Sequence, residues 1–497
     1  MGGHLHGGRR AVAALGVTLL AAVAVGGCDD PTPQRAPSSP TMSPSPASSP
    51  GPADIARWAA GRSDPVPDTI YPSRGNAGLD VLHYGLDLTW SQQTRTLTGT
   101  AALQLRATAD LPRITLDFLH DYVIDSVTVN GKSVSGSTSP QDKLTVPTPL
   151  TKDAAAAVVV RYHGTPRPIA DPSKRTDIEP LGLTVTPTGE LWTMQEPYGA
   201  LTWYPVNDQP SDKALYDIAV TAPAGWVGVA SGTPAGTSGQ TNRYTTTDPV
   251  SSYLTTVAVG PFKKEEANGP RGLPLTYWVR PQDADELEVA RESPAMIAWL
   301  EQRFGPYPFA SGGLVVVDSR SAMETQQLVT MGQMGPVGIG RPRFERNLLH
   351  EYAHQWFGDT VSPKTWKDVW LNEGWAYYAQ VLWQQDKDHT PNADLDQMML
   401  TEDAADRKES GPPGTPRADS FAARNVYTCA AAMLHQIRKT VGDTAFFTMA
   451  RGWSQEHRNG SADRATFIAY VNKSTGRDLT ALINTWLDST TQPRPVT

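Results

Sequence analysis

The sequence predicts an α+β protein of more than one domain, in which an antiparallel β domain precedes a mainly helical domain. Every second side chain is apolar over residues 82–90, a pattern typical of a half-buried strand. After residue 262 helical patterns take over. They cover residues 285–303, 344–357, 371–386 and 425–440, with one strand-like apolar run at 314–317. Strands first and helices afterwards indicate an α+β architecture.

The first half continues the strand pattern, with turn signals between the strands. The alternation recurs at residues 97–105, 114–118 and 127–129, and Asn130-Gly131 is typical of a hairpin turn. No long helical period is found before residue 262. We therefore assign residues 54–265 to the β domain and residues 266–497 to the second domain.

The N-terminus predicts export from the cytoplasm. Arg9 and Arg10 precede an alanine-rich apolar run, residues 11–25, which is too short to span a bilayer comfortably. The run ends at Val25-Gly26-Gly27-Cys28, which resembles a bacterial lipoprotein box. We expect residues 1–28 to be a lipoprotein signal peptide and Cys28 to be acylated, which anchors the protein at the extracytoplasmic face of the cell membrane, with some of it released. An ordinary secretory signal, in which Cys28 is incidental, is the alternative.

Composition limits the partners. Residues 29–53 form a linker with eight prolines among serines and alanines, which cannot build a core. The net charge of −8 argues against a nucleic-acid partner. Cys429 is the only other cysteine, so no internal disulfide can form if Cys28 is lipidated. The sequence carries no signal for an oligomeric state.

The strongest chemical signal is His350-Glu351-Tyr352-Ala353-His354, followed after eighteen residues by Glu373. On a helix, residues four apart are separated by about 40° around the axis and about 6 Å along it, so His350 and His354 can hold one ion. Two imidazoles and a carboxylate leave a position for water on zinc and lower the pKa of that water, and Glu351 can take its proton. The pattern predicts a hydrolase with one zinc ion.

These residues resemble the zinc aminopeptidases of the aminopeptidase N and leukotriene hydrolase type. The segments His350 to Gly358, HEYAHQWFG, and Trp370 to Gly374, WLNEG, stand where the family has HELAHQWFG and WLNEG. The resemblance implies a saddle-shaped β domain followed by a thermolysin-like domain, with His350, His354 and Glu373 as zinc ligands and Glu351 as general base. Many members carry a further helical C-terminal domain that encloses the site. This chain ends about 120 residues after Glu373, so we expect a short two-domain member with a more open site.

Two further motifs imply binding of a substrate's free amine. Ser321-Ala322-Met323-Glu324-Thr325 resembles the family's GAMEN strand, which makes Ala322, Met323 and Glu324 substrate-binding residues. Thr193-Met194-Gln195-Glu196, followed by a Tyr204 to Pro210 segment and Lys213-Ala214, resembles the TQFE, FPCFDEP and KA signature, which makes Glu196 the second amine anchor. The match is not complete. Ser321 replaces the family's glycine and Thr325 its asparagine, and Met194 replaces the glutamine that often precedes the second glutamate by two residues.

An oxyanion donor is implied by Val426 to Ala431, which resembles the family's VYEKGA and places Tyr427 as the phenol donor. Read alone, Tyr427 is a helix-face core aromatic. Asp368 is either a partner of a zinc histidine or a solvated helix cap. Arg320 either lines the pocket for the first side chain or is a surface arginine.

The sequence thus predicts a lipid-anchored zinc aminopeptidase acting on peptides with a free N-terminus. A thermolysin-like zinc endopeptidase is the alternative among hydrolases. A catalytically inactive peptide-binding lipoprotein is the alternative outside that class, although neither the ligands nor the base are eroded here.

Overall fold

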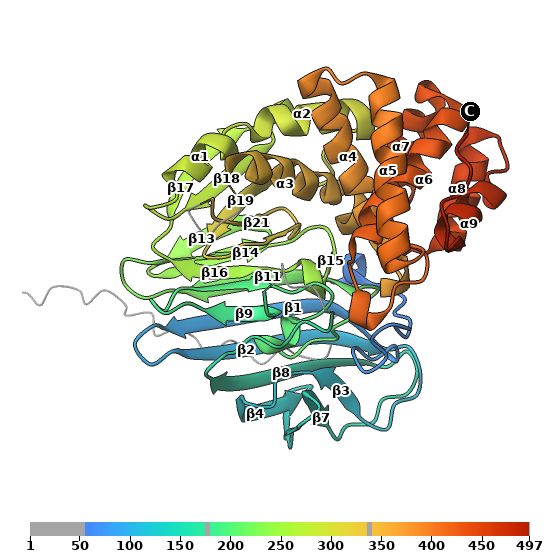
Figure 1. The fold of residues 1–497 in the computed structure, drawn as a ribbon. Helices are drawn as coiled ribbons and strands as arrows, with labels where there is room; N and C mark the ends of the chain where they lie inside the picture. The colour runs from blue at the N-terminus through green and yellow to red at the C-terminus, as the bar shows by residue number, and fades with distance from the viewer. Residues whose placement is uncertain (1–54, 174–178, 335–339, 497) are drawn as a thin grey trace, which may run out of the picture. The chain divides into compact units, whose positions relative to one another are not determined.

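Strands dominate the first half of the chain and helices the second, as Figure 1 shows in the change from blue and green arrows to orange and red coils. The computed structural model describes residues 55–173, 179–334 and 340–496. All of these residues belong to one compact unit, Ser49–Thr497. A β-rich N-terminal part followed by a helical C-terminal part confirms the predicted fold class.

The strands of the N-terminal part are β1 (Leu79–Ser91), β2 (Thr96–Ala107), β3 (Ile114–Asp117), β4 (Val123–Val129), β5 (Lys132–Val134), β6 (Ser137–Ser139), β7 (Lys143–Val146), β8 (Ala155–Gly164), β9 (Gly182–Val185), β10 (Leu191–Met194), β11 (Lys213–Thr221), β12 (Val227–Ala230), β13 (Thr233–Ser238), β14 (Thr241–Thr245), β15 (Val250–Ser251) and β16 (Val257–Gly260). Short 3₁₀ turns are η1 (Ala59–Gly61), η2 (Ala200–Thr202) and η3 (Ser252–Leu254).

These strands form three sheets. The largest has nine strands in the order β13-β14-β11-β1-β2-β8-β4-β5, with β15 also pairing to β11, and the smaller ones run β12-β16-β10-β9 and β3-β7-β6. Pairing is antiparallel except between β1 and β11, which lie side by side in parallel, His83 opposite Leu215. The alternation read from the sequence is present in the second half of β1, where Leu86, Leu88 and Trp90 are buried, whereas His83, expected to face solvent, is buried too. The alternation places one face of the large sheet in the core.

The second part contains a sheet and nine α-helices in the described residues. Its strands are β17 (Lys263–Asn268), β18 (Pro274–Val279), β19 (Gly312–Val317), β20 (Ala322–Met323) and β21 (Val329–Gly332), in the sheet order β17-β18-β19-β21-β20, and β22 (Val361–Pro363) pairs with β23 (Gly460–Ala462). Its helices are α1 (Ala284–Ala290), α2 (Ser293–Phe304), α3 (Arg341–His354), α4 (Trp370–Asp388), α5 (Asn392–Ser410), α6 (Arg424–Val441), α7 (Asp443–Glu456), α8 (Arg464–Thr475) and α9 (Thr480–Asp488), with short turns η4 (Pro270–Gly272), η5 (Gln355–Asp359), η6 (Trp366–Asp368) and η7 (Ala418–Ser420).

The helix expected over residues 285–303 is two helices. Pro294 lies in the first turn of α2, and α1 ends at Ala290. Proline has no N–H to donate and disfavours a helical conformation in the residue before it, so a helix begins at this position more readily than it runs through it. The residue chosen as the domain boundary, 265, lies within β17, which pairs with β18.

Hydrogen bonds join the β-rich part to the segment that follows α3. Lys213 of β11 donates from Nζ to the Asp359 carbonyl oxygen at 2.6 Å, and Tyr253 donates to the Gly358 carbonyl oxygen at 3.3 Å. The Trp366 N–H donates to the Asp68 carboxylate at 2.7 Å. The β-rich part therefore fixes the chain between α3 and α4, which are the helices that carry the predicted zinc ligands.

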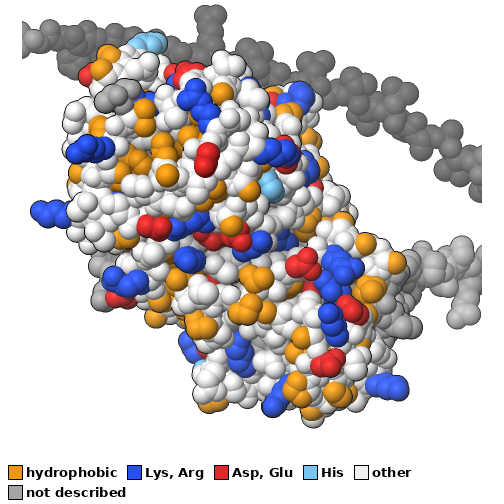
Figure 2. Space-filling view, turned by 90° about the vertical axis from the view of Figure 1, so that its right-hand side faces the viewer, with side chains coloured by type: hydrophobic (Ala, Val, Ile, Leu, Met, Phe, Trp, Pro, Cys, Tyr) orange, Lys and Arg blue, Asp and Glu red, His pale blue; other side chains and the backbone are white. Residues whose placement is uncertain are grey.

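The face of the molecule drawn in Figure 2 carries basic and acidic side chains interspersed with apolar ones. Within the described residues no helix is long and apolar enough to span a membrane. Cys28, the predicted signal peptide and the whole predicted linker lie outside the described residues.

Candidate active site and metal centre

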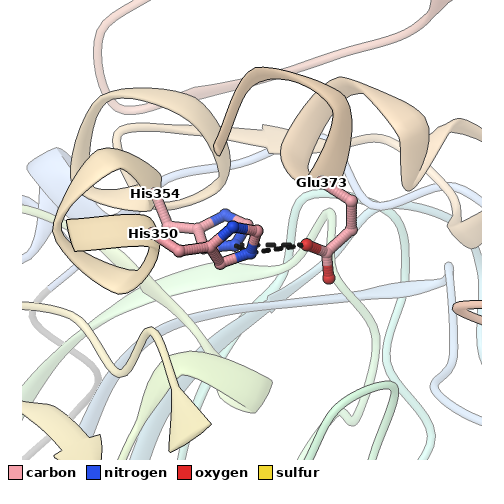
Figure 3. Close-up of side chains that lie close together, drawn as sticks. All are labelled: His350, His354 and Glu373. Carbon is pink, nitrogen blue, oxygen red and sulfur yellow. Dashed lines mark hydrogen bonds and ion pairs between the residues drawn. The ribbon is translucent and has the colours of Figure 1, made fainter. Parts of the chain in front are cut away.

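Helices α3 and α4 bring the three predicted zinc ligands together, as Figure 3 shows. His350 Nε2 lies 3.1 Å from His354 Nε2 and 3.1 Å from Glu373 Oε2, and His354 Nε2 lies 3.3 Å from the same Glu373 oxygen. Two ligands of a tetrahedral zinc ion, each about 2.0 to 2.1 Å from the metal, lie about 3.3 Å apart. The spacing of the three donor atoms therefore fits one zinc ion.

The orientation of His354 is fixed by the turn that follows α3. Its Nδ1 lies 3.1 Å from the carbonyl oxygen of Phe357, a pairing that makes Nδ1 the donor and leaves Nε2 free to bind a metal. Gly358 has a φ of 132°, a conformation that side chains rarely adopt, and a Cβ there would lie 3.3 Å from His354 Nδ1. The glycine is needed for this turn to pass so close to the ligand.

Lys213 stabilises the same turn from the β-rich part. Its side chain is buried, and burial lowers its pKa to about 7 although the charge of Asp359 opposes this. Besides the Asp359 carbonyl oxygen, it donates to the Thr360 carbonyl oxygen at 3.4 Å. Sequence reasoning gave Lys213 only as part of a signature. Its role in holding the turn after α3 depends on a hydrogen bond to a residue 146 positions later in the chain, which no local sequence pattern reveals.

A second set of donor atoms shares His354 with the first. Ligand atoms of Glu324, Glu351 and His354 lie within 4.8 Å of one another, and all three residues are buried. Two imidazoles and one carboxylate at closer spacing make the first set the better zinc site, which leaves two carboxylates beside the metal position. Zinc bound by His350, His354 and Glu373 would offset the negative charge of this cluster.

The cluster perturbs the pKa values of its members. Burial raises the pKa of Glu351, and the charges of Glu324 and Glu373 raise it further, while His354 opposes them. Burial also raises the pKa of Glu324. For Glu373, burial acts in the same direction, but the charge of His354 and hydrogen bonds from both histidines outweigh it and lower the pKa. The cluster thus holds one ionised carboxylate, Glu373, as ligand, next to two carboxylates whose pKa values are raised by burial.

The two amine anchors implied by the motifs lie on the wall of the same cavity of about 1010 Å³. Glu324 follows strand β20, is 3% exposed, and its Oε1 has no hydrogen-bond partner among the described residues. Glu196 is half-buried and follows β10. Both residues thus line the cavity that also contains the zinc ligands, and a ligand atom of Glu324 lies within 4.8 Å of one of His354.

Asp208 holds the loop that follows Glu196. Its Oδ2 accepts from the Gly199 and Leu201 N–H groups at 3.0 and 3.3 Å, and its Oδ1 accepts from Ser252 Oγ at 2.8 Å. Burial raises its pKa to about 6. Sequence reasoning included Asp208 in a motif but gave it no role.

Ala322 and Met323 form the edge strand of the five-stranded sheet. Ala322 pairs with Met331 and Met323 with Thr330, so one side of β20 is bonded to β21. The other side has no strand partner in the described residues and borders the cavity. An unpaired strand edge can bind an extended peptide through main-chain hydrogen bonds.

Tyr427 lies on α6 and lines the cavity. Its ring is half-buried and lies roughly parallel to that of His350, with centroids 6.0 Å apart. Gly374 allows α4 to approach α6 closely, because a Cβ at Gly374 would lie 2.5 Å from the Ala430 Cβ. Ala430, which departs from the family's usual glycine, is thus accommodated by the glycine opposite.

Asp368 and Arg320 do not contact the zinc ligands. Asp368 is buried, and its Oδ1 accepts from Trp370 Nε1 at 3.1 Å, so it fixes the start of α4. Arg320 is a surface arginine, with 58% of its side chain exposed, and its Nε lies 3.9 Å from Glu179 Oε1.

Two family models match the chain in order: the Peptidase M1 N-terminal domain over residues 81–254 and the Peptidase family M1 domain over residues 289–486. Aminopeptidase N of Streptomyces lividans is 26% identical over 446 residues, which are 83% of this chain and 50% of that protein. Aminopeptidase 2 of Candida albicans is 25% identical over 439 residues, 82% of this chain and 46% of that protein. The chain spans half or less of the length of these curated relatives.

Solved structures match over nearly their whole length. The crystal structure of an M1 zinc metallopeptidase from Deinococcus radiodurans has a TM-score of 0.76 and 29% identity, covering 87% of this chain and 99% of that one. A mutant of an M1 zinc metallopeptidase from the same organism, bound to a Tyr-Ser-Ala substrate, has a TM-score of 0.74 and 28% identity. With both domain models matched and three ligands spaced for zinc, the chain belongs to peptidase family M1, the family of zinc metallopeptidases.

Proposed function

We propose that this protein is a zinc aminopeptidase, which removes residues one at a time from the N-terminus of peptides. The observation that carries the proposal is the pair of carboxylates, Glu324 and Glu196, on the wall of the zinc cavity. Neither belongs to the set of three donor atoms spaced for zinc. A substrate ammonium group is the partner that such carboxylates favour, because a charge-assisted hydrogen bond satisfies both charges away from water.

Zinc would be held by His350, His354 and Glu373 and would polarise a water molecule and the carbonyl group of the first residue. Glu351 lies on α3 between the two histidine ligands in sequence, and its carboxylate is close to His354 and so to the zinc position. From there its carboxylate would take a proton from the attacking water and pass it to the leaving amine.

Tyr427 donates its O–H to the oxygen of the scissile carbonyl as negative charge develops there. The motive is its place on the cavity wall, with its ring beside that of His350. Such a donor stabilises the transition state more than the ground state, because the charge on that oxygen grows during attack.

Strand β20 holds the substrate backbone in this proposal. The free edge at Ala322 and Met323 leads directly to Glu324, so a peptide paired with this edge presents its first residue to the amine anchor. Relatives named aminopeptidase N and a neighbour bound to the tripeptide Tyr-Ser-Ala support peptides as substrates.

A digest of one unblocked peptide of about ten residues tests the proposal. Mass spectrometry at successive times should show loss of the first residue, then the second, in a ladder. Fragments cut at internal bonds from the earliest time would instead indicate a thermolysin-like endopeptidase, and an intact peptide in the presence of zinc would indicate a peptide-binding protein without catalysis.

The location outside the cytoplasm is part of the proposal and is supported by the N-terminal sequence alone. The apolar run before Cys28 and the proline-rich linker after it favour a lipid anchor that holds the folded body away from the membrane. Cys28→Ser should shift the activity from the membrane fraction to the soluble fraction without changing turnover. Retention of the serine variant in the membrane fraction would contradict acylation at Cys28.

A further inference from the structure

Along helix α3, the side chains that line the cavity change from acidic near its C-terminal end to basic nearer its N-terminal end. At one end, Glu324 lies with Glu351 beside His354, in the last turn of the helix. At the other end, Arg346 and Arg343 line the cavity wall. A helix rises about 1.5 Å per residue, which places Arg346 about 6 Å and Arg343 about 10 Å before His350 along the axis. The acidic and basic ends therefore lie on opposite sides of the zinc position.

The cavity-facing arginines of α3 lack the partners that the outer charges of this helix have. On the outer side, Arg341 Nη1 lies 3.0 Å from Glu288 Oε2, and Glu345 pairs with Lys387. In contrast, neither Arg343 nor Arg346 forms an ion pair with any of the residues that the structure describes.

The other arginines of the cavity wall are already paired. Arg417 Nε lies 3.0 Å from Asp419 Oδ1, and Arg424 Nε lies 3.2 Å from Asp406 Oδ2. The two guanidinium groups on α3 thus differ from the two other arginines of the cavity wall, each of which is paired with an aspartate. A guanidinium group on a cavity wall is suited to bind a carboxylate through two parallel hydrogen bonds.

We propose that Arg346 and Arg343 bind a carboxylate of the substrate on the far side of the scissile bond. The inference rests on the proposed aminopeptidase function and names its substrate class, which is short peptides. An extended chain advances about 3.3 to 3.6 Å per residue, so its second or third residue after the scissile bond reaches Arg346 or Arg343. The carboxylate is either the C-terminus of a tripeptide or tetrapeptide or the side chain of an aspartate or glutamate at these positions.

Paired peptides distinguish the two sources. Leu-Ala-Ala and Leu-Ala-Ala-Ala are compared as free acids and as C-terminal amides, and the amide of Leu-Ala-Asp-Ala is compared with that of Leu-Ala-Asn-Ala. In at least one of these pairs, we expect the peptide with the extra carboxylate to have a kcat/KM about tenfold or more above that of the peptide without it. A charge-assisted hydrogen bond typically provides a free energy of this size. Whichever pair differs identifies the source.

Variants assign the effect to the arginines. Arg346→Met and Arg343→Met together should bring the carboxylate-to-neutral ratio close to one, and Arg346→Lys should retain part of it. The matched control is Arg341→Gln, which lies on the same helix and faces outward, and which should keep the ratio of the unchanged protein. Dissociation constants of the same peptides for zinc-loaded Glu351→Gln, measured by calorimetry, provide a readout that does not need turnover.

A ratio near one in the unchanged protein for every pair, or a ratio that survives in the double arginine variant, would overturn the inference. The proposed function fails separately. If the two peptides of every pair lose their first residue equally fast, the aminopeptidase function is supported and the carboxylate site is contradicted. If nothing is trimmed but the dissociation constants depend on the carboxylate and on both arginines, the carboxylate site stands and the aminopeptidase falls.

Discussion

Glu351 and the two histidines occupy consecutive turns of α3 but have separate tasks. His350 Nε2 and His354 Nε2 converge with Glu373 Oε2 at 3.1 to 3.3 Å, whereas Glu351 belongs only to the looser carboxylate set. Removing Glu351 therefore leaves the zinc site intact, and the two roles can be measured apart.

Glu351→Gln should bind close to one zinc ion per chain and lose about 10³-fold or more in turnover, which is within the range of general-base contributions. Zinc content and turnover are measured on one preparation. Full turnover in a variant with full zinc content would contradict the assignment of Glu351 as the base.

Tyr427→Phe keeps the ring beside His350 and removes only the hydroxyl group. Losing one oxyanion donor typically lowers turnover about 10² to 10³-fold. Because the ring is retained, the melting temperature should change little. Normal turnover, or a variant that melts much earlier, would show that Tyr427 acts in packing rather than in catalysis.

At the scale of elements, the turn and loops around the site are fixed by long-range contacts. Lys213 holds the turn after α3, and Asp208 holds the loop after Glu196. Asp208 has a pKa raised to about 6 by burial, so the folded state binds its proton more tightly than the unfolded chain does. Its contribution to stability is therefore complete below its unfolded pKa of about 3.8 and is lost as the pH rises to about 6.

Asp208→Asn lacks this titration. The free energy of unfolding of the natural protein minus that of the variant should fall between pH 4 and pH 6, by about 2 to 3 kcal/mol if the full shift applies. Denaturant unfolding at a series of pH values measures it, and loss of zinc at low pH affects both proteins alike. A difference that stays constant over this range would show that Asp208 does not titrate in the folded protein near pH 6.

The sequence predicted those features that depend on local geometry. The positions of His350 and His354 follow from helical spacing, and α3 was placed within three residues at each end, with 344–357 expected and Arg341–His354 found. The parallel pairing of β1 with β11 was not predictable, since it joins His83 to Leu215 across the chain. The sequence shows that Arg346 is charged. It does not show that Arg346 has no carboxylate partner among the described residues, because that depends on which residues surround it in the folded cavity.

At the scale of the whole molecule, one continuous hydrophobic core runs through both parts, from Tyr84 of the large sheet to Trp375 of α4. The zinc ligands lie within this body, since Glu373 is 3% exposed and His354 is 1% exposed. Without metal, buried carboxylates lie close together with only two histidines to offset their charge. Metal binding to the folded state alone should therefore stabilise the entire unit.

Chelation of zinc should lower the melting temperature, and added zinc should restore it. At a free zinc concentration of about 1,000 times Kd, linkage gives about 4 kcal/mol. Glu373→Gln, which loses one ligand, should respond much less at the same concentration. Differential scanning calorimetry of both proteins with and without zinc measures this, and an equal response of the two would argue for a different metal site.

The central claim is that buried carboxylates beside the zinc ligands hold the free amine of the substrate. The most direct measurement is kcat/KM for one peptide with a free and with an acetylated N-terminus, in the natural protein, in Glu324→Gln, and in Glu409→Gln as a control that changes an exposed acid of the same cavity. We predict a preference for the free peptide of about 10²-fold or more, narrowed in Glu324→Gln by slower cleavage of the free peptide and kept in Glu409→Gln. Comparable cleavage of free and acetylated peptides by the natural protein would contradict the claim.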